Sequence, residues 1–304
     1  MDNEYIDLFG SIPEFKNWKE ISRINKGWST DEKFFIKNME GKQFLLRLNN
    51  ISEFDKKKSE FDAIKLITST GINMSKPIDF GTCCNNKNVY MLLTWIEGES
   101  AEEALPKLSE NEQYKLGIKA GIVLRKIHLI PIESVVINCE ETLRKKVETK
   151  MLQYKDCGIK VPNDKKFLEF ILKNIGYLRD IKQTIRHGDY HVGNIIITQD
   201  RKIGVIDFNR FDFGDPWKEF NRLMTFSRKI SIPFAKGQID GYFTNEVPDL
   251  FFKLSALYTA YDSLFSIIST IPFGGEDIKN TICLSKMIFD DYNGFDSYIP
   301  KWYK

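Results

Sequence analysis

Three side chains with oxygen atoms suited to metal binding or proton transfer lie in one stretch of the sequence. The stretch runs from Arg186 to Phe208 and reads RHGDYHVGNIIITQDRKIGVIDF, with Asp189, Asn194 and Asp207 around an Ile-rich segment. Carboxylate and amide oxygens are ligands for a hard cation such as Mg²⁺. Asp189, on the loop before the Ile-rich segment, has a second carboxylate, which can accept or orient a proton. The pattern therefore predicts metal-assisted chemistry at this loop.

The residues between Asn194 and Asp207 predict a β-hairpin. Its strands are residues 195–198 and 203–206, and residues 199–202 form the turn. If the hairpin is symmetric about this turn, Asn194 pairs with Asp207, and directly opposed Cβ atoms lie ~4.5–5.5 Å apart. An amide oxygen would then lie beside a carboxylate at one end of the hairpin, which favours a Mg²⁺ site.

Two other interpretations remain open for this stretch. His187, Asp189 and His191 alternate, so on a strand they would share one face and could bind zinc or iron. Gly188 and Gly193 favour a loop instead. The zinc interpretation also leaves Asn194 and Asp207 without a role. The second alternative is a buried polar turn with a purely structural function.

The elements that must position these residues form two groups. The first third of the chain predicts strands at residues 18–25, 33–38, 42–50, 77–84 and 88–96, and one helix at 52–70 with Ser52 as its cap. Later residues predict helices at 109–130, with Ser109 as cap, and at 164–181, followed by four helical segments after the hairpin. We therefore expect an α+β chain with a β-rich lobe, residues 1–97, and a mainly helical lobe, residues 98–304.

Bulk composition excludes several classes of protein. Lys and Arg number 44 and Asp and Glu 42, so the net charge of +2 gives no electrostatic case for nucleic acid binding. The five cysteines form no C-x-x-C motif, which is typical of a reduced, cytoplasmic protein. The longest apolar stretch, residues 251–270, contains Lys253 and Asp262, whereas a membrane span needs ~20 mostly apolar residues. We expect a monomer that binds neither nucleic acid nor membranes.

The motif HGDYHVGN followed by VIDF resembles the catalytic loop and metal motif of the aminoglycoside phosphotransferase family, within the protein-kinase-like superfamily. The shared pattern is His-x-Asp, four residues, Asn, and then Ile-Asp-Phe after a short hairpin, and the resemblance covers nearly the whole chain. It implies a bilobal kinase-like fold, with an antiparallel sheet and one helix in the small lobe. It also implies Asp189 as the catalytic residue, Asn194 and Asp207 as Mg²⁺ ligands, and His187 as a structural brace, but it assigns no role to His191.

The same resemblance implies a site for ATP or GTP in the first lobe. Arg47 stands where a phosphate-binding Lys is usual, with Glu60 on the following helix as its partner. This Arg is a departure from the family, as is Asn209, which replaces the Gly typical of protein kinases. The remaining nucleotide-binding residues implied are those of a phosphate-covering turn and of an inter-lobe hinge: Lys26, Gly27, Trp28, Ser29 and Thr30, and Thr94, Trp95 and Ile96.

The acceptor-binding residues implied are carboxylates, because aminoglycosides are polycations. Asp212, Glu219 and Asp262 follow the metal motif and are the residues predicted for this role. Asp215 precedes Pro216 and predicts a helix start instead. The charge at Asp262 interrupts an apolar helical stripe, so it needs either a cleft or a basic partner within the lobe.

The function implied is transfer of the γ-phosphoryl group of ATP or GTP to a hydroxyl of an aminoglycoside, a reaction of antibiotic resistance. Two alternatives remain. One is a kinase of the same fold that acts on another small alcohol, such as a macrolide, an amino alcohol or a sugar, which the slightly basic net charge favours. The other is a nucleotide-binding protein without turnover, which the presence of Asp189, Asn194 and Asp207 together disfavours.

Overall fold

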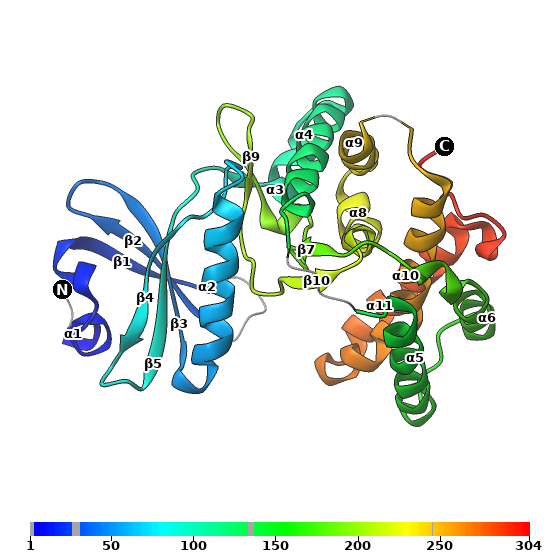
Figure 1. Ribbon diagram of the computed structural model, residues 1–304, viewed down its shortest axis with the longest axis horizontal. Coiled ribbons are helices and arrows are strands. Elements are labelled where there is room, and N and C mark those ends of the chain that lie inside the picture. The colour runs from blue at the N-terminus through cyan, green and yellow to red at the C-terminus, as the bar shows by residue number, and fades with distance from the viewer. Residues whose placement is uncertain (1–2, 26–30, 133–136, 245) are drawn as a thin grey trace. The chain divides into compact units, whose positions relative to one another are not determined.

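The computed structural model describes residues 3–25, 31–132, 137–244 and 246–304 (Figure 1). The chain forms two compact units. The first contains the residues up to Glu99 together with Asn194–Phe211, and the second contains Ser100–Gly193 and Asp212–Lys304. The lobe boundary expected at residue 97 places residues 194–211 in the second lobe, whereas these residues belong to the first unit. No helix in the described ranges is long and apolar enough to cross a membrane.

The first unit is built on an antiparallel five-stranded sheet in the order β1-β2-β3-β5-β4. The strands follow the predicted ranges closely: β1 (Trp18–Ile24), β2 (Glu32–Asn38), β3 (Gln43–Asn50), β4 (Pro77–Cys83) and β5 (Asn88–Thr94). Alternate side chains of a strand point to opposite faces. In β3, Leu46 and Leu48 therefore point to one face and Arg47 to the other. The leucine face packs with Phe9 of α1 (Asn3–Phe9) and with Trp18 in an apolar core.

The helix α2 (Phe54–Thr68) lies beside the sheet and contacts β4 and β5 (Figure 1). A 3-10 turn, Ile51–Glu53, precedes it, and the side chain of Asn50 caps this turn by accepting from Ser52 N at 3.0 Å. The prediction of Ser52 as the cap was therefore wrong. The buried side of α2 contains Ala63, Ile64 and Ile67 at helical spacing, and also Lys57 and Glu60.

The hairpin of β8 (Ile195–Ile197) and β9 (Ile203–Val205) joins the first unit through backbone bonds of Val205 with Asn73 O at 3.0 Å and Ser75 N at 3.2 Å. Ile195 pairs with Val205 and Ile197 with Ile203, one residue away from the predicted register.

The loop that connects the two strands explains this shift. Thr198 N donates to Lys202 O at 3.1 Å, and Arg201 takes φ +58°. The connection is thus a three-residue loop that ends in a left-handed residue, not a four-residue turn. Asn194 consequently lies opposite Ile206, whose N–H donates to Asn194 O at 3.1 Å.

The second unit is mainly helical and contains one short antiparallel pair, β7 (Thr184–Arg186) with β10 (Asp212–Gly214). The predicted helix at 109–130 is α4, and Ser109 begins it with a capping box that includes Glu112. The predicted helix at 164–181 is shorter, because α6 ends at Asn174 and a 3-10 turn follows. The α-helices of the unit are α3 (Ala101–Ala104), α4 (Glu110–His128), α5 (Cys139–Asp156), α6 (Asp164–Asn174), α7 (Phe220–Arg222), α8 (Arg228–Ile230), α9 (Ile232–Phe243), α10 (Asp249–Thr270) and α11 (Gly275–Asp291).

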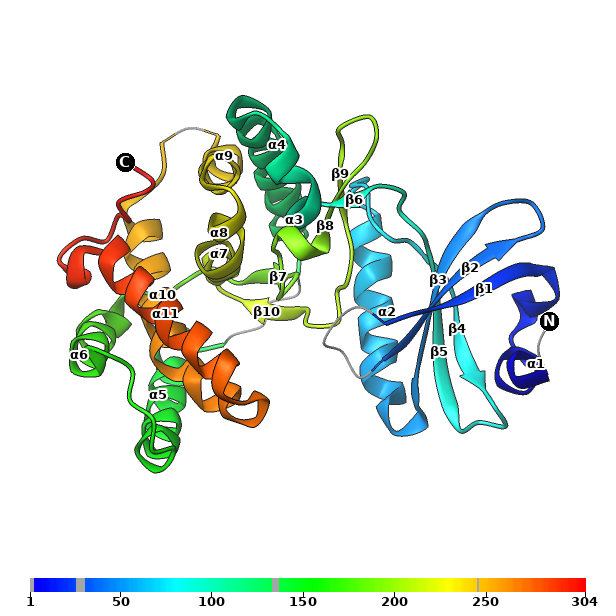
Figure 2. The ribbon, with the colours of Figure 1, turned by 180° about the vertical axis from the view of Figure 1, so that it is seen from behind.

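Two further features belong to the second unit. A π-helix, Leu223–Ser227, joins α7 to α8. The helix α5 was not predicted from the sequence. It packs with α6, α10 and α11 around a common apolar core (Figure 2).

The helices α4 and α9 approach each other closely at four glycines. A Cβ atom added to Gly117 or Gly121 of α4 would lie 2.2 Å from a backbone oxygen of α9, and one added to Gly237 or Gly241 would lie 2.2 Å from a backbone oxygen of α4. The two backbones are therefore in contact along this seam. Because α4 also contacts the polar loop after β7, as shown below, the seam fixes part of the site.

We predict that Gly121→Ala destabilises the protein by about 1–3 kcal/mol, because its methyl group would overlap the backbone of α9. Gly176→Ala is the control, since no atom lies within 4 Å of its added Cβ. The measurement is the free energy of unfolding in urea. Equal stability of the two variants would contradict the close contact.

Candidate active site

The loop of residues 187–193 follows β7. Two hydrogen bonds of the Arg186 side chain anchor the residue that precedes it. Arg186 Nε donates to Asp212 Oδ1 at 2.7 Å and Arg186 NH1 donates to Asp215 O at 3.2 Å. Gly188 takes φ +82°, a left-handed conformation that suits glycine. The strand β7 thus fixes the position at which the loop begins within the second unit.

The carboxylate of Glu219 binds the backbone of this loop. Gly188 N donates to its Oε2 at 3.1 Å and Tyr190 N donates to its Oε1 at 3.4 Å. The side chain is 1% exposed, and His128 Nε2 lies 3.7 Å from Oε2. Burial opposes ionisation, but the contact with His128 and the charges of His187 and Arg186 outweigh it and lower the pKa of Glu219 to about 2. The residue predicted to bind the acceptor is therefore a buried support of the loop.

The side chains of His187 and Tyr190 lock the loop from inside. His187 is fully buried, and its Nδ1 accepts from Asp189 N at 3.2 Å. Tyr190 is also fully buried, and its hydroxyl donates to Ala120 O of α4 at 2.8 Å. His187 thus has the bracing position that the sequence implied, and the loop is attached to α4 directly.

Asp189 lies at the exposed side of the loop, next to the side chains of Arg222 and His191. Arg222 Nε lies 3.0 Å from Asp189 Oδ1, and His191 Nε2 lies 3.7 Å from Oδ2. The Asp189 side chain is 16% exposed. Its carboxylate is therefore accessible but held in orientation, as an acid–base group requires.

The geometry disfavours the zinc interpretation of this loop. His187 Nδ1 and His191 Nδ1 each accept a backbone N–H two residues later, at 3.2 and 3.1 Å. The His191 ring stacks on Phe226 at 5.1 Å between centroids. In the described part of the chain, no three His, Cys, Asp or Glu side chains are grouped so as to hold a metal ion.

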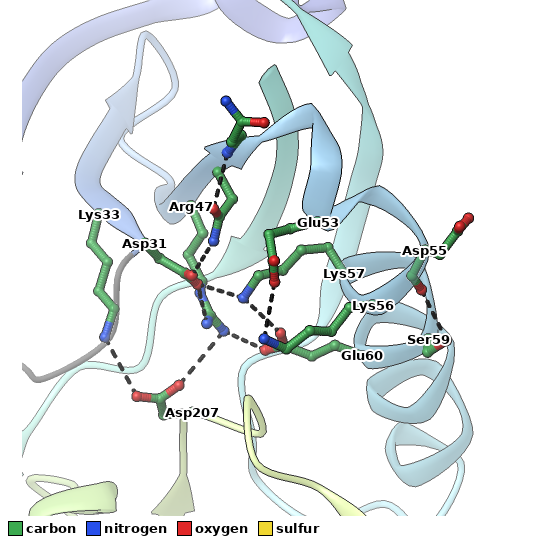
Figure 3. A network of polar contacts seen from close by, with 12 residues as sticks. Asp31, Lys33, Arg47, Glu53, Asp55, Lys56, Lys57, Ser59, Glu60 and Asp207 are labelled. Atoms are coloured by element: carbon green, nitrogen blue, oxygen red, sulfur yellow. Dashed lines mark hydrogen bonds and ion pairs between the residues drawn. The ribbon is translucent and has the colours of Figure 1, made fainter. Parts of the chain in front are cut away.

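In the first unit, Arg47 is the centre of a buried ion network (Figure 3). Arg47 is 3% exposed, its Nε donates to Asp31 Oδ2 at 2.7 Å, and its NH1 donates to Glu60 Oε1 at 2.5 Å. Lys57 Nζ joins the same two carboxylates at 2.8 and 3.1 Å. The contact predicted between Arg47 and Glu60 is present, whereas Asp31 was not predicted as a partner.

These contacts determine the charge state of the network. Burial disfavours the charged form of Arg47, but Glu60, Asp207 and Asp31 outweigh it and raise the pKa of the guanidinium. Burial likewise opposes ionisation of Asp31, and the charges of Arg47 and Lys57 lower the pKa of that carboxyl. Both groups are therefore ionised, and each of the three guanidinium nitrogens of Arg47 already donates to Asp31 or Glu60.

Asp207 follows β9 in an unusual conformation, with φ +65°, which Asp tolerates better than most residues. Lys33 Nζ lies 3.4 Å from its Oδ2, and Arg47 NH1 lies 3.6 Å from its Oδ1 (Figure 3). This Oδ1 atom is buried yet accepts no hydrogen bond from any residue that the structure describes. Such an oxygen, at the hairpin end that also carries Asn194, fits a hard cation such as Mg²⁺.

The predicted hinge residues are partly committed to the sheet. Thr94 N donates to Lys76 O at 2.9 Å and Trp95 N donates to Gln43 O at 3.1 Å. Neither N–H can therefore also serve a purine edge, which leaves the carbonyl groups of these residues and the backbone from Ile96 onward for that contact. The turn residues Lys26, Gly27, Trp28, Ser29 and Thr30 lie outside the described residues.

A family comparison explains why these features occur in one chain. Residues 20–251 match the model of the phosphotransferase enzyme family. The chain belongs to this family. No curated protein matches it in a sequence search.

Several solved structures share the fold of this phosphotransferase family member. Aminoglycoside phosphotransferase APH(2'')-Ib with ADP superimposes with a TM-score of 0.69 at 20% identity, over 95% of this chain and 99% of that one. The GDP complex of the F108L mutant of aminoglycoside 2'-phosphotransferase-IIIa gives 0.73 at 13%, over 97% and 99%. A thermostable APH(4)-Ia mutant with ADP and hygromycin B gives 0.67 at 14%, over 92% and 96%. The predicted resemblance and the bilobal α+β kinase-like fold are thus confirmed.

The other two residues predicted for acceptor binding line a cavity of about 600 Å³ in the second unit. Asp212 is bonded to Arg186, as described above. Asp262 accepts a hydrogen bond from Asn221 Nδ2. Burial raises the pKa of Asp262, although the charges of Lys218 and Arg222 oppose this. Asp262 therefore has the basic neighbours that its place in an apolar helix required.

We predict that Glu219→Ala destabilises the phosphotransferase by about 3 kcal/mol, because two loop N–H groups lose their acceptor and the buried groups around it lose a negative charge. The pKa of Glu219 is depressed from 4.5 to about 2, so its contribution is complete above pH 4.5 and is lost as the pH falls toward 2. Urea unfolding between pH 7 and pH 2 should show a smaller acid-side loss in the variant. An unchanged pH dependence would contradict this role.

Proposed function

We propose that the protein is a Mg²⁺-dependent phosphotransferase that moves the γ-phosphoryl group of ATP or GTP to a hydroxyl group of a small molecule. The observation that carries this proposal is the carboxylate of Asp207, which lies between two cations and has a buried oxygen that accepts from no donor among the described residues. That arrangement suits a metal-bound triphosphate. Nucleotides bound to the structural relatives, namely ADP and GDP, support the same assignment.

Phosphoryl transfer depends mainly on positioning and on neutralisation of phosphate charge. Asp207 and Asn194 would hold Mg²⁺, which neutralises negative charge on the phosphates when bound. Asp189 orients the acceptor hydroxyl and takes its proton as the hydroxyl oxygen bonds to the γ-phosphorus. The bond from that phosphorus to the β-phosphate oxygen breaks, and the nucleoside diphosphate leaves.

Aminoglycosides are the first acceptor class to consider. Structures of relatives contain streptomycin with ATP, gentamicin, and hygromycin B. The second candidate is another small alcohol, and one observation favours it: basic side chains outnumber acidic ones around the cavity of the second unit. A non-catalytic nucleotide-binding role is disfavoured, because Asp189 is mounted on a rigid loop that such a role does not need.

The test of this function is to incubate the protein with ATP or GTP, Mg²⁺ and a panel of aminoglycosides, macrolides, amino alcohols and sugars. A product heavier by one phosphoryl group is expected. Asp189→Asn should lower the transfer rate by about 10²–10⁴-fold and leave the nucleotide Kd unchanged. Asp200→Asn, at an exposed hairpin turn, is the matched control. Normal turnover of the Asp189 variant would exclude the acid–base assignment.

We infer that Lys33, not Arg47, contacts the donor phosphates. Lys33 of β2 lies directly opposite Arg47 of β3 in the sheet register, so both point to the same face. The guanidinium group of Arg47 donates hydrogen bonds to Asp31 and Glu60. The only carboxylate within ion-pair distance of Lys33 among the described residues is Asp207, the proposed metal ligand. Lys33 can therefore turn to phosphate when a metal occupies Asp207, whereas Arg47 holds the two strands and α2 together.

Substitutions should separate these two roles. Lys33→Met is expected to raise the donor KM and lower kcat by about tenfold or more, while the free energy of unfolding changes little. Arg47→Met should destabilise the fold by about 3–5 kcal/mol, because it leaves buried carboxylates unpaired. Lys37→Met, on the same strand face, is the control for Lys33. Unaltered donor kinetics in Lys33→Met would return the phosphate contact to Arg47.

A further inference from the structure

The cavity of the second unit has a cationic wall. It lies between α5, β10, the 3-10 turn Pro216–Glu219 and α10, and its volume is about 600 Å³. Asp212, Asp215 and Asp262 are its three acidic residues. Basic residues are more numerous, and they are Lys145, Lys146, Lys150, Arg186 and Lys218. A ligand inside this cavity therefore meets an excess of positive charge.

Two of the three carboxylates are already satisfied by the protein. Asp212 accepts from Arg186 Nε at 2.7 Å. Asp215 is 2% exposed and accepts from Trp217 N at 2.9 Å and from Tyr258 OH at 2.8 Å. The charge of Asp212 is thus offset by Arg186, although its side chain is half-exposed, and Asp215 is buried away from a ligand. Asp262 bonds Asn221 and lies near Lys218 and Arg222, so its charge is offset as well.

Lys218 is the basic residue with the most informative surroundings. It is half-buried, and within the described ranges its Nζ has no carboxylate at ion-pairing distance. Burial, followed by the like charges of Arg186 and Lys146, lowers the pKa of its amino group and outweighs the opposing charges of Asp262 and Asp212. A cation placed beside two other cations in a partly dry site costs free energy unless an anion offsets it.

The cavity and the proposed catalytic residue share charged neighbours in the second unit. Arg186, on the cavity wall, is three residues before Asp189. Arg222 contacts Asp189 at 3.0 Å, and its charge also acts on Asp262 of the cavity. Arg222 therefore connects Asp189 electrostatically with Asp262 of the cavity, although Asp189 is not among the residues that line it.

We propose that the acceptor is an anionic alcohol, a small hydroxylated molecule whose carboxylate or phosphate group binds Lys218 together with Lys146. This inference rests on the proposed function, because it identifies the cavity as the acceptor site. Leu143, Phe213 and Tyr261 add apolar surface for the carbon skeleton. A polycationic aminoglycoside would instead place its ammonium groups against the lysines.

Three hexoses of similar size and different charge provide a direct test: glucuronate, glucose and glucosamine. Their Kd values are measured by NMR titration of the full chain, with ADP and Mg²⁺ present so that the nucleotide site is filled. Wild-type protein should bind glucuronate at least about tenfold more tightly than glucosamine, and Lys218→Glu should abolish or reverse this order. Lys155→Glu makes the same charge change on α5 outside the cavity and should leave the order intact.

The results separate this inference from the proposed function. A glucuronate preference that Lys218→Glu removes supports the anionic site, even if no acceptor is phosphorylated, in which case the transferase proposal fails alone. Phosphorylation of gentamicin in preference to glucuronate, with no effect of Lys218→Glu, overturns the anionic acceptor and leaves the transferase proposal standing. Absence of glucuronate binding, or equal binding of the three hexoses, also overturns the inference.

Discussion

The buried carboxylate of Glu219 is the interaction on which the loop of residues 187–193 depends. The loop bends through Gly188 with a positive φ, so its backbone N–H groups cannot pair with a neighbouring strand. Buried N–H groups need an acceptor, and Glu219 supplies one for Gly188 and Tyr190. The charge of Glu219 is offset in turn by His128, His187 and Arg186. The position of Asp189 thus follows from how one buried anion is satisfied.

The same requirement governs the first unit with the signs reversed. Arg47 is a buried cation, and burial of a charge is tolerated only where opposite charges and hydrogen bonds compensate for it. Asp31 and Glu60 provide this compensation, so Arg47 becomes a structural link between β3 and α2. A cation that is fully paired inside the protein is poorly placed to serve a ligand. The less buried Lys33 on the adjacent strand therefore becomes the better candidate for phosphate.

The sequence predicted those elements whose signals are local. Alternation of apolar residues identified the five strands of the first sheet, and the capping residue Ser109 identified the start of α4. The predicted hairpin register was wrong by one residue, because the left-handed conformation of Arg201 shortens the loop. That conformation is selected by the tertiary context and has no local signal in the sequence. The helix α5 was missed because its buried side has only Leu143, Val147 and Tyr154, amid mostly charged residues.

The roles of individual charges were harder to predict than their positions. Asp212, Glu219 and Asp262 are equally acidic in sequence, yet one is bonded to Arg186, one supports a loop, and one lies in a cavity. Only burial and partners distinguish them, and both are tertiary properties. The motif HGDYHVGN followed by VIDF contains Asp189, Asn194 and Asp207, the residues proposed to act on phosphate. Much of the cavity wall comes from α5 and α10, outside that motif. The chemistry of the acceptor therefore depends on residues of the cavity wall that the motif does not contain.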